Sequence, residues 1–265
     1  EQLLKDPHNT IDFDEELDSL IDQRVAAVGA DGRLIWDKND SVYNVNLTEK
    51  LLATVLSKLS NFIPEAGIWM NTQRPEWNDA NNALVGYGVS MVTLYYTRRY
   101  QQYLLDLFSE VEFDQVEIST ELVELLNSIN STFVDNRHLL EGKISDTDRR
   151  LILDRLGRAA DSFRAGLYSH GFAGGRVAVE TSQLIAFCQT SLEFIDHSIR
   201  ANRRQDGLYH AYNLMKVDAD GGISIRYLYE MLEGQVAVLS SGKLDAAESL
   251  DVLKALRASS LYRAD

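Results

Sequence analysis

Proline, cysteine and basic residues are all scarce in this sequence, and each scarcity limits what the protein can be. Three prolines and no low-complexity stretch leave no linker in the 265 residues, so we expect a single domain over residues 1–265. The only cysteine, Cys188, has no partner for an internal disulfide and cannot form a thiolate metal site alone. Its apolar surroundings, "LIAFCQTSLEF", predict a buried and unreactive thiol.

Positive charge is also in short supply, because 26 Lys and Arg face 40 Asp and Glu and leave a net charge of −14. Nucleic acids and anionic membranes both select concentrated positive charge, so we expect neither as a partner, whereas a neutral sugar is not repelled. No apolar run approaches the ~18 residues of a membrane span and no signal peptide opens the chain. We therefore expect a soluble protein, with the cytoplasm slightly favoured. The first residue is Glu1 rather than Met, which favours a piece of a longer protein.

Apolar residues recur at helical spacing along most of the chain. Asp12, Asn46 and Asp245 each precede a Glu by three positions, which is the pattern of a capping box. Two stretches, 27–36 and 218–225, are instead predicted as short hairpins. The expected helices span residues 12–27, 47–60, 82–107, 120–134, 146–165, 178–202, 226–239 and 245–262.

The predicted fold class is therefore all-α, with short hairpins in the loops. Successive amphipathic helices separated by polar loops fit either a helical toroid or a solenoid. No repeat of fixed period is present, which favours the toroid. We expect an (α/α)6 toroid or a large part of one, because eight helices are fewer than its six pairs. In a toroid the loops at one end converge on a single pocket.

The stretch "QRPEWNDANN", residues 73–82, concentrates the residue types that a sugar site needs. Glu76 and Asp79 are carboxylates three positions apart, and glycosidic cleavage needs a carboxylic acid to protonate the leaving oxygen. Trp77 offers a flat apolar surface for a sugar ring. The side-chain amides of Asn78, Asn81 and Asn82 can bind hydroxyl groups.

The same stretch also fits a helix start without any function. Asn78 or Asp79 would then cap the expected helix 82–107, and Trp77 would pack as its hydrophobic staple. Both interpretations stay open on the residues alone.

The longer segment "EWNDANNALVGYGVSMVTLYYTRRY" resembles the cellobiose phosphorylases and related (α/α)6-barrel, or six-hairpin, glycosidases. In that family a Trp-Asn-Asp element precedes a buried helix, and its aspartate is the general acid. The resemblance covers mainly residues 73–105 and assigns this role to Asp79. Pro75-Glu76 and Ala80 replace the residues that usually flank the element, so hydrolysis and phosphorolysis both stay open.

A second cluster lies in "QDGLYHAYNLM", residues 205–215. Tyr209 and Tyr212 could present aromatic faces to a sugar, and His210 could bind a hydroxyl or a phosphate. The alternative is a loop whose tyrosines pack on the core.

The helix expected over 226–239 contains two glutamates one turn apart, Glu230 and Glu233. We predict Glu233 as the opposing base of an inverting enzyme, because apolar neighbours would raise its pKa. The alternative is a pair of solvent-facing helix glutamates.

His170 and Arg176 flank the glycine-rich "SHGFAGGRVAVE" and could hold a phosphate, although an ordinary flexible loop also explains the stretch. The turn around Asp218 and Asp220 lacks the outer carboxylates of a calcium loop, and no histidine spacing indicates zinc, so no metal is expected. Arg203-Arg204 is interpreted as charge on a helix surface.

Together these patterns predict an acidic carbohydrate-active enzyme without a cofactor that cleaves a glycosidic bond with inversion. Its partners would be an oligosaccharide or glycoside and, for phosphorolysis, inorganic phosphate. Two alternatives stay open. One is a non-catalytic helical domain that binds a glycan or a protein, and the other is a structural scaffold.

Overall fold

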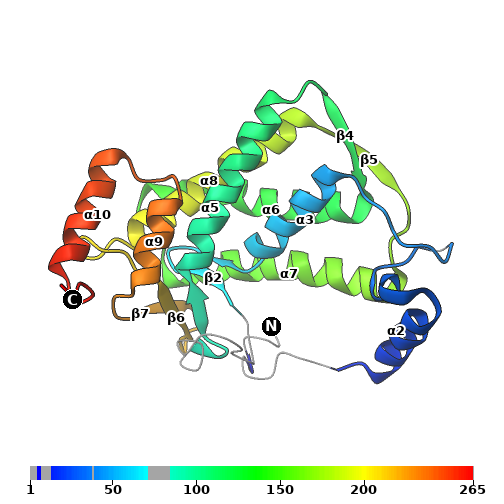
Figure 1. Cartoon of the computed structure of the whole chain (residues 1–265), viewed down its shortest axis with the longest axis horizontal. Helices are drawn as coiled ribbons and strands as arrows, with labels where there is room; N and C mark the ends of the chain where they lie inside the picture. The colour runs from blue at the N-terminus through cyan, green and yellow to red at the C-terminus, as the bar shows by residue number, and fades with distance from the viewer. Residues whose placement is uncertain (1–4, 7–12, 38, 71–83, 265) are drawn as a thin grey trace.

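The computed structural model describes residues 5–6, 13–37, 39–70 and 84–264, and helices dominate this part of the chain (Figure 1). Two short 3-10 helices, η1 and η2, accompany the α-helices. The helices are α2 (Glu15–Val28), η1 (Gly29–Arg33), α3 (Leu47–Leu59), α5 (Met91–Glu110), α6 (Thr120–Asp135), η2 (Arg137–Glu141), α7 (Asp146–His170), α8 (Thr181–Ala201), α9 (Leu232–Ser240) and α10 (Ala246–Ala258).

Each of the eight expected helices has a counterpart, whose boundaries either coincide with the expected ones or differ from them by up to nine residues. Asn46 accepts a hydrogen bond from the Glu49 amide at the start of α3, and Asp245 forms the expected capping box of α10. For α2 the cap is Asp14, while Asp12 lies outside the described residues. Local periodicity and capping chemistry thus locate the helices.

The helix expected from residue 82 begins only at Met91, which is a correction. Gly86 has φ 77°. Gly88 begins a strand, and a Cβ added to Gly88 would lie 2.5 Å from Leu84 Cβ. Ser90 caps the helix by accepting a hydrogen bond from the Thr93 amide. A turn at residues 85–87 and a strand at residues 88–90 therefore take positions that helical spacing assigned to the helix.

The hairpin expected at 27–36 is also wrong, because Gly29–Arg33 forms η1. Gly29 ends α2 with φ 78°, a backbone conformation that residues with a side chain rarely adopt. Gly32 packs so closely on α2 that an added Cβ would lie 2.4 Å from the Val25 amide nitrogen. The glycines turn the chain back onto the helix rather than into a strand.

A five-stranded antiparallel sheet makes the fold mostly helical rather than all-α. Its strand order is β1-β2-β3-β6-β7, and β4 pairs with β5 in a separate two-stranded sheet. The hairpin expected at 218–225 is confirmed as the turn between β6 and β7. The strands are β1 (Phe62–Ile63), β2 (Gly67–Trp69), β3 (Gly88–Ser90), β4 (Gln115–Ser119), β5 (Arg176–Glu180), β6 (Tyr212–Val217) and β7 (Ile223–Tyr227).

Helices α3, α5, α6, α7 and α8 pack around the largest hydrophobic core. In Figure 1, α7 runs beneath α3 and α6, while the larger sheet and the helices α9 and α10 lie at the left. The β4–β5 sheet lies at the upper right, and α2 stands apart at the lower right. This arrangement separates the sheet, with its loops, from the β4–β5 end of the molecule.

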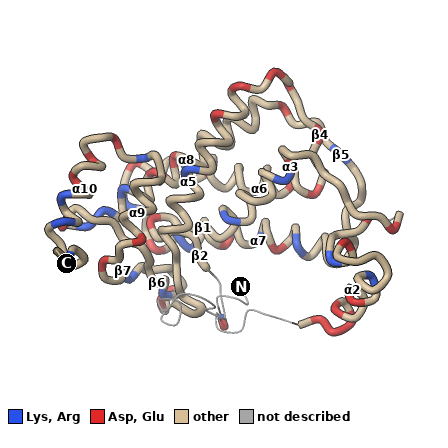
Figure 2. The backbone as a smooth tube through the Cα atoms, viewed as in Figure 1, with Lys and Arg blue, Asp and Glu red and all other residues tan. Residues whose placement is uncertain are grey.

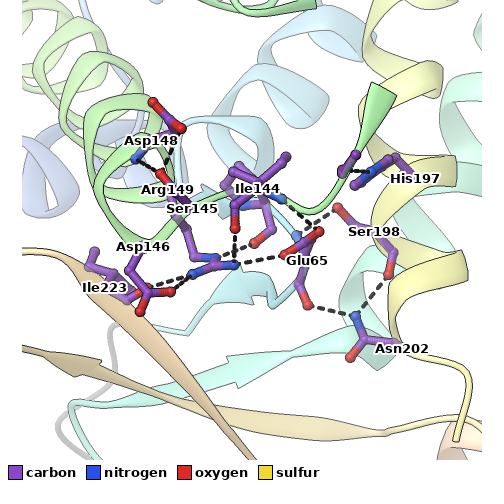
Figure 3. Close-up of polar contacts among 12 residues, drawn as sticks. Glu65, Ile144, Ser145, Asp146, Asp148, Arg149, His197, Ser198, Asn202 and Ile223 are labelled. Carbon is purple, nitrogen blue, oxygen red and sulfur yellow. Dashed lines mark hydrogen bonds and ion pairs between the residues drawn. The ribbon is translucent and has the colours of Figure 1, made fainter. Parts of the chain in front are cut away.

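Arg149, in the first turn of α7, joins the two edges of the larger sheet (Figure 3). It donates to the carbonyl oxygen of Pro64 beyond β1 and to that of Ile223 in β7, at 2.9 and 2.6 Å. Its guanidinium also lies 2.7 Å from the buried carboxylate of Glu65, which has φ 61°. Since β1 and β7 are the outer strands, this one side chain holds the sheet curled and fixes the turn that leads into β2.

Acidic and basic residues are scattered along the described chain, and the first turn of α2 carries three acidic residues, Glu15, Glu16 and Asp18 (Figure 2). Among the described residues, none of the helices combines the length and apolar content needed to cross a bilayer.

Candidate functional site

The candidate site lies at the end of the larger sheet, where β2 leads into residues 71–83 and β3 follows them. Leu84 belongs to a buried cluster with Tyr212, and Met70 packs against the same cluster. Met231, the residue before α9, packs there as well. Both ends of the 71–83 segment are therefore attached where β6 and α9 begin.

Five of the predicted site residues lie within that segment and outside the described residues. The structure therefore places none of their side chains. They are Glu76, Trp77, Asn78, Asp79 and Asn82.

Tyr212 and Glu233 lie side by side at this point. Tyr212 opens β6 and is only 7% exposed, whereas Glu233, in the first turn of α9, is exposed. Burial, followed by the charge of Glu233 and a hydrogen bond with its side chain, raises the pKa of Tyr212 to about 12. Tyr212 therefore keeps its proton at neutral pH and can donate it to the Glu233 carboxylate. The prediction of apolar surroundings for Glu233 is wrong, because this residue is exposed to solvent.

His210 stacks on Tyr227, the last residue of β7, with ring centroids 4.4 Å apart and planes at 17°. Burial, and then the positive charge of Arg204, lowers the pKa of His210 to about 4. The imidazole is thus neutral at pH 7. Its Nδ1 atom is buried and has no hydrogen-bond partner among the described residues. A neutral ring of this kind suits a hydroxyl ligand better than it suits an anion.

Arg204 joins the loop after α8 to the segment between β7 and α9. Its guanidinium lies 2.8 Å from Asp206 and 3.2 Å from Glu230, and it is 19% exposed. Glu230 also accepts a hydrogen bond from the Ser260 hydroxyl. Its pKa is lowered, chiefly by a hydrogen bond with its own backbone and then by Ser260. The prediction that Arg204 is simple surface charge is therefore wrong, because Arg204 forms ion pairs with Asp206 and Glu230.

Tyr209 lies in the core rather than at the surface. It is 3% exposed, and its ring meets Tyr95 edge to face with centroids 6.5 Å apart. Its backbone amide and carbonyl both bind the side chain of Gln235. Of the two interpretations of this tyrosine, the structure supports core packing.

His170 and Arg176 lie away from this site, at the end of α7 and the start of β5 (Figure 1). Arg176 forms an ion pair with the buried carboxylate of Glu49 at 2.9 Å and also donates to the carbonyl oxygen of Asn44. These contacts occupy its guanidinium. The structure does not bring His170 or Arg176 together with Tyr212 and Glu233.

Cys188 has the environment that its sequence predicts. It is fully buried, and burial raises its thiol pKa to about 12. Within the described ranges, His, Cys, Asp and Glu form no cluster of three that could hold a metal ion.

Two surface hollows lie elsewhere among the described residues. One, of about 560 Å³, lies between η2 and α8, and the other, of about 480 Å³, lies between α6 and α7. Neither is lined by a residue of the candidate site.

Sequence reasoning missed Tyr227, Arg204 and Gln235. Tyr227 and Tyr229 are two positions apart in "RYLYE", and this spacing indicates aromatic residues on one face of a strand. Arg204 binds Glu230 and Gln235 binds Tyr209, each at a distance of 26 residues in the chain, and local pattern carries no sign of such contacts.

Comparison with protein-family models finds no match for the chain, and comparison with curated proteins finds none either.

Proposed function

We propose that this protein cleaves a glycosidic bond with inversion, using Asp79 as general acid and Glu233 as base. The observation that supports the proposal is that Met70 and Leu84, on either side of residues 71–83, pack at the cluster of Tyr212. This tyrosine adjoins Glu233 through the close contact of Ala211 with Gly234. The described residues that flank the Trp-Asn-Asp element, Met70 and Leu84, thus lie in the region of the proposed base.

Chain length is compatible with this pairing. Leu84 is five positions after Asp79, and five residues span at most about 18 Å when fully extended. Inverting glycosidases hold their two carboxyl groups about 6.5–9.5 Å apart to admit a water molecule. The proposal requires Asp79 and Glu233 to face each other at that distance, with the water between them.

Each residue of the proposed site has a separate task. Asp79 protonates the leaving oxygen, and exposed Glu233 activates the attacking water, with Glu76 as the alternative carboxylate. Tyr212 donates to Glu233 and holds it. The sugar is bound by Trp77, Asn78, Asn82 and His210.

Hydrolysis is favoured over phosphorolysis. A phosphorylase needs cationic groups beside the attacking anion. Arg176 is engaged by Glu49, and His210 is neutral at pH 7. Inorganic phosphate therefore remains the second choice as the attacking group.

The (α/α)6 toroid, or a large part of one, is the architecture that we propose for this activity. In support, α5 packs on α8 and α9, and α6 packs on α7 and α8, as neighbouring helices of a toroid do. The candidate residues also come from the ends of elements rather than from helix middles.

A panel of disaccharides and aryl glycosides, each with and without inorganic phosphate, tests the proposal. We expect release of a sugar with inverted anomeric configuration from at least one substrate, without a requirement for phosphate. No turnover across the panel by the folded protein would contradict the proposal.

Glycan binding without cleavage is the second candidate function. Tyr227 and Tyr229 are 46% and 70% exposed beside the same site, and exposed aromatic faces bind sugar rings. This candidate predicts calorimetric binding of an oligosaccharide that Tyr229→Ala weakens, with no product formed.

A further inference from the structure

Glu233 belongs to the sequence Glu233-Gly234-Gln235, and the two residues after it are fully packed. Gly234 and Gln235 are both buried, and Gln235 is 0% exposed. At its start α9 lacks a side-chain cap, because Met231 occupies the cap position. Something other than capping must therefore fix its first turn, in which Glu233 lies.

Gln235 binds the backbone of Tyr209 in both directions. Its Oε1 atom accepts a hydrogen bond from the Tyr209 amide at 2.9 Å. Its Nε2 atom donates to the Tyr209 carbonyl at 2.8 Å and to the Met231 carbonyl at 3.0 Å. A primary amide has one acceptor and two donor hydrogens, so this environment uses all of them. The side chain can be accommodated in one orientation only.

Gly234 brings α9 and the start of β6 into close contact. A Cβ added to Gly234 would lie 2.9 Å from Ala211 Cβ and 3.0 Å from Ala211 Cα. Ala211 is itself fixed, because its carbonyl accepts hydrogen bonds from the Met91 and Val92 amides at the start of α5. Ala211 precedes Tyr212, just as Gly234 follows Glu233.

From these contacts we propose that Gln235 is a positioning residue, which with Gly234 locks α9 onto residues 209–211 and thereby sets the Glu233 carboxylate against the Tyr212 hydroxyl. Gln235 bonds the residue three before Tyr212 and lies two after Glu233, so the two contacting side chains are carried by one rigid connection. The geometric part of this inference stands alone, and its catalytic consequence rests on the proposed function.

The test follows the Tyr212–Glu233 contact by ¹⁹F NMR of protein labelled with fluorotyrosine. Tyr212→Phe assigns the resonance, and Glu233→Gln defines its shift when the carboxylate charge is lost. Gln235→Met removes the hydrogen bonds to Tyr209 at similar volume. We expect it to move the Tyr212 resonance toward the position found in Glu233→Gln.

Gln101→Met is the matched control. Gln101 is equally buried, donates to Ser191 between α5 and α8, and is not part of the site. Its loss should lower stability as the loss of any buried amide does, yet leave the Tyr212 resonance in place. A shift of similar size in both variants, or no shift in folded Gln235→Met, would overturn the inference.

Two further variants keep the test decisive if Gln235→Met does not fold. Gly234→Ala should displace the first turn of α9 and shift the same resonance, because the contact with Ala211 leaves no room for a methyl group. Gln235→Glu should show the shift at neutral pH, because a carboxylate can accept from the Tyr209 amide but cannot donate to the Tyr209 carbonyl. Native-like spectra in both variants at neutral pH would also overturn the inference.

Activity separates this inference from the proposed function. If glycoside turnover is found, Gln235→Met should lower kcat by about 100-fold with little change in KM, as misplacement of a catalytic group by about 1 Å does. If wild-type protein shows no turnover but the resonance moves as expected, the proposed function fails and the positioning role stands.

Discussion

The guanidinium of Arg149 lies 2.7 Å from the carboxylate of Glu65, and both side chains are almost completely buried. Every N–H group of Arg149 has an acceptor, so the pair is satisfied within the protein (Figure 3). The acceptors are the carbonyl oxygens of Pro64, Ile144 and Ile223 and the carboxylates of Glu65 and Asp146.

Arg149→Met or Glu65→Gln alone should therefore destabilise the fold strongly. Removing one partner leaves the other charge buried and unpaired, which costs about 3–5 kcal/mol. The free energy of unfolding in urea measures the loss. The double variant should lose less than the sum of the single variants.

The exposed ion pair of Arg155 with Asp135 provides the control. Arg155→Met should change the free energy of unfolding by less than about 1 kcal/mol, because solvent screens this pair. Equal losses at both positions would contradict the assigned role of Arg149.

Acid should destabilise the protein through His210. Its pKa is about 4 when folded and about 6.5 when unfolded, so the unfolded state takes up a proton first. The stability contributed by neutral His210 is complete above pH ~6.5 and is lost as pH falls toward ~4. This loss lowers the free energy of unfolding by at most about 3 kcal/mol. Urea unfolding at several pH values should show a smaller acid loss for His210→Gln than for wild type. The same loss in both proteins would show that His210 is not desolvated. His138→Gln, at an exposed histidine, should behave as wild type.

Glu233→Gln should lower the pKa of Tyr212. Burial is the larger cause of the raised value and remains in the variant, so the pKa should fall from about 12 yet stay above its ordinary value near 10. Tyrosinate absorbance after a rapid pH jump, with Tyr212→Phe subtracted, measures it. Glu230→Gln, three residues earlier and outside α9, should have no such effect, since Glu230 is not among the causes of the raised Tyr212 pKa.

Cys188 should resist thiol reagents in the folded protein. It is fully buried, and burial raises its pKa to about 12, so thiolate is scarce and inaccessible. Labelling by a disulfide reagent should proceed at the rate of unfolding and accelerate in urea. Rapid stoichiometric labelling without denaturant would contradict this burial.

Sequence predicted the helices well because their signals are local. Asn46 and Asp245 cap helices as expected, and the apolar residues of α3 and α6 face the core. Apart from its β6–β7 hairpin, the larger sheet escaped prediction, because its other strands are two or three residues long and β3 pairs across distance. β3, for example, pairs with β6 through Val89 and Asn213.

The candidate site was predictable only in part. Tyr212 and Glu233 carried recognisable chemistry, but their contact depends on the packing of Gly234 against Ala211. Tyr209 had the same chemistry and lies in the core. Residue type therefore indicated candidates, and long-range packing decided which of them meet.

The proposed role of Asp79 as general acid is tested most directly by comparing the turnover of wild type, Asp79→Asn and Glu76→Gln. The substrate is whichever glycoside the panel of disaccharides and aryl glycosides identifies. We expect Asp79→Asn to abolish turnover and leave the urea unfolding transition in place, because the amide keeps the shape but has no proton to give. Glu76→Gln should retain more activity. Wild-type turnover in folded Asp79→Asn would contradict the account.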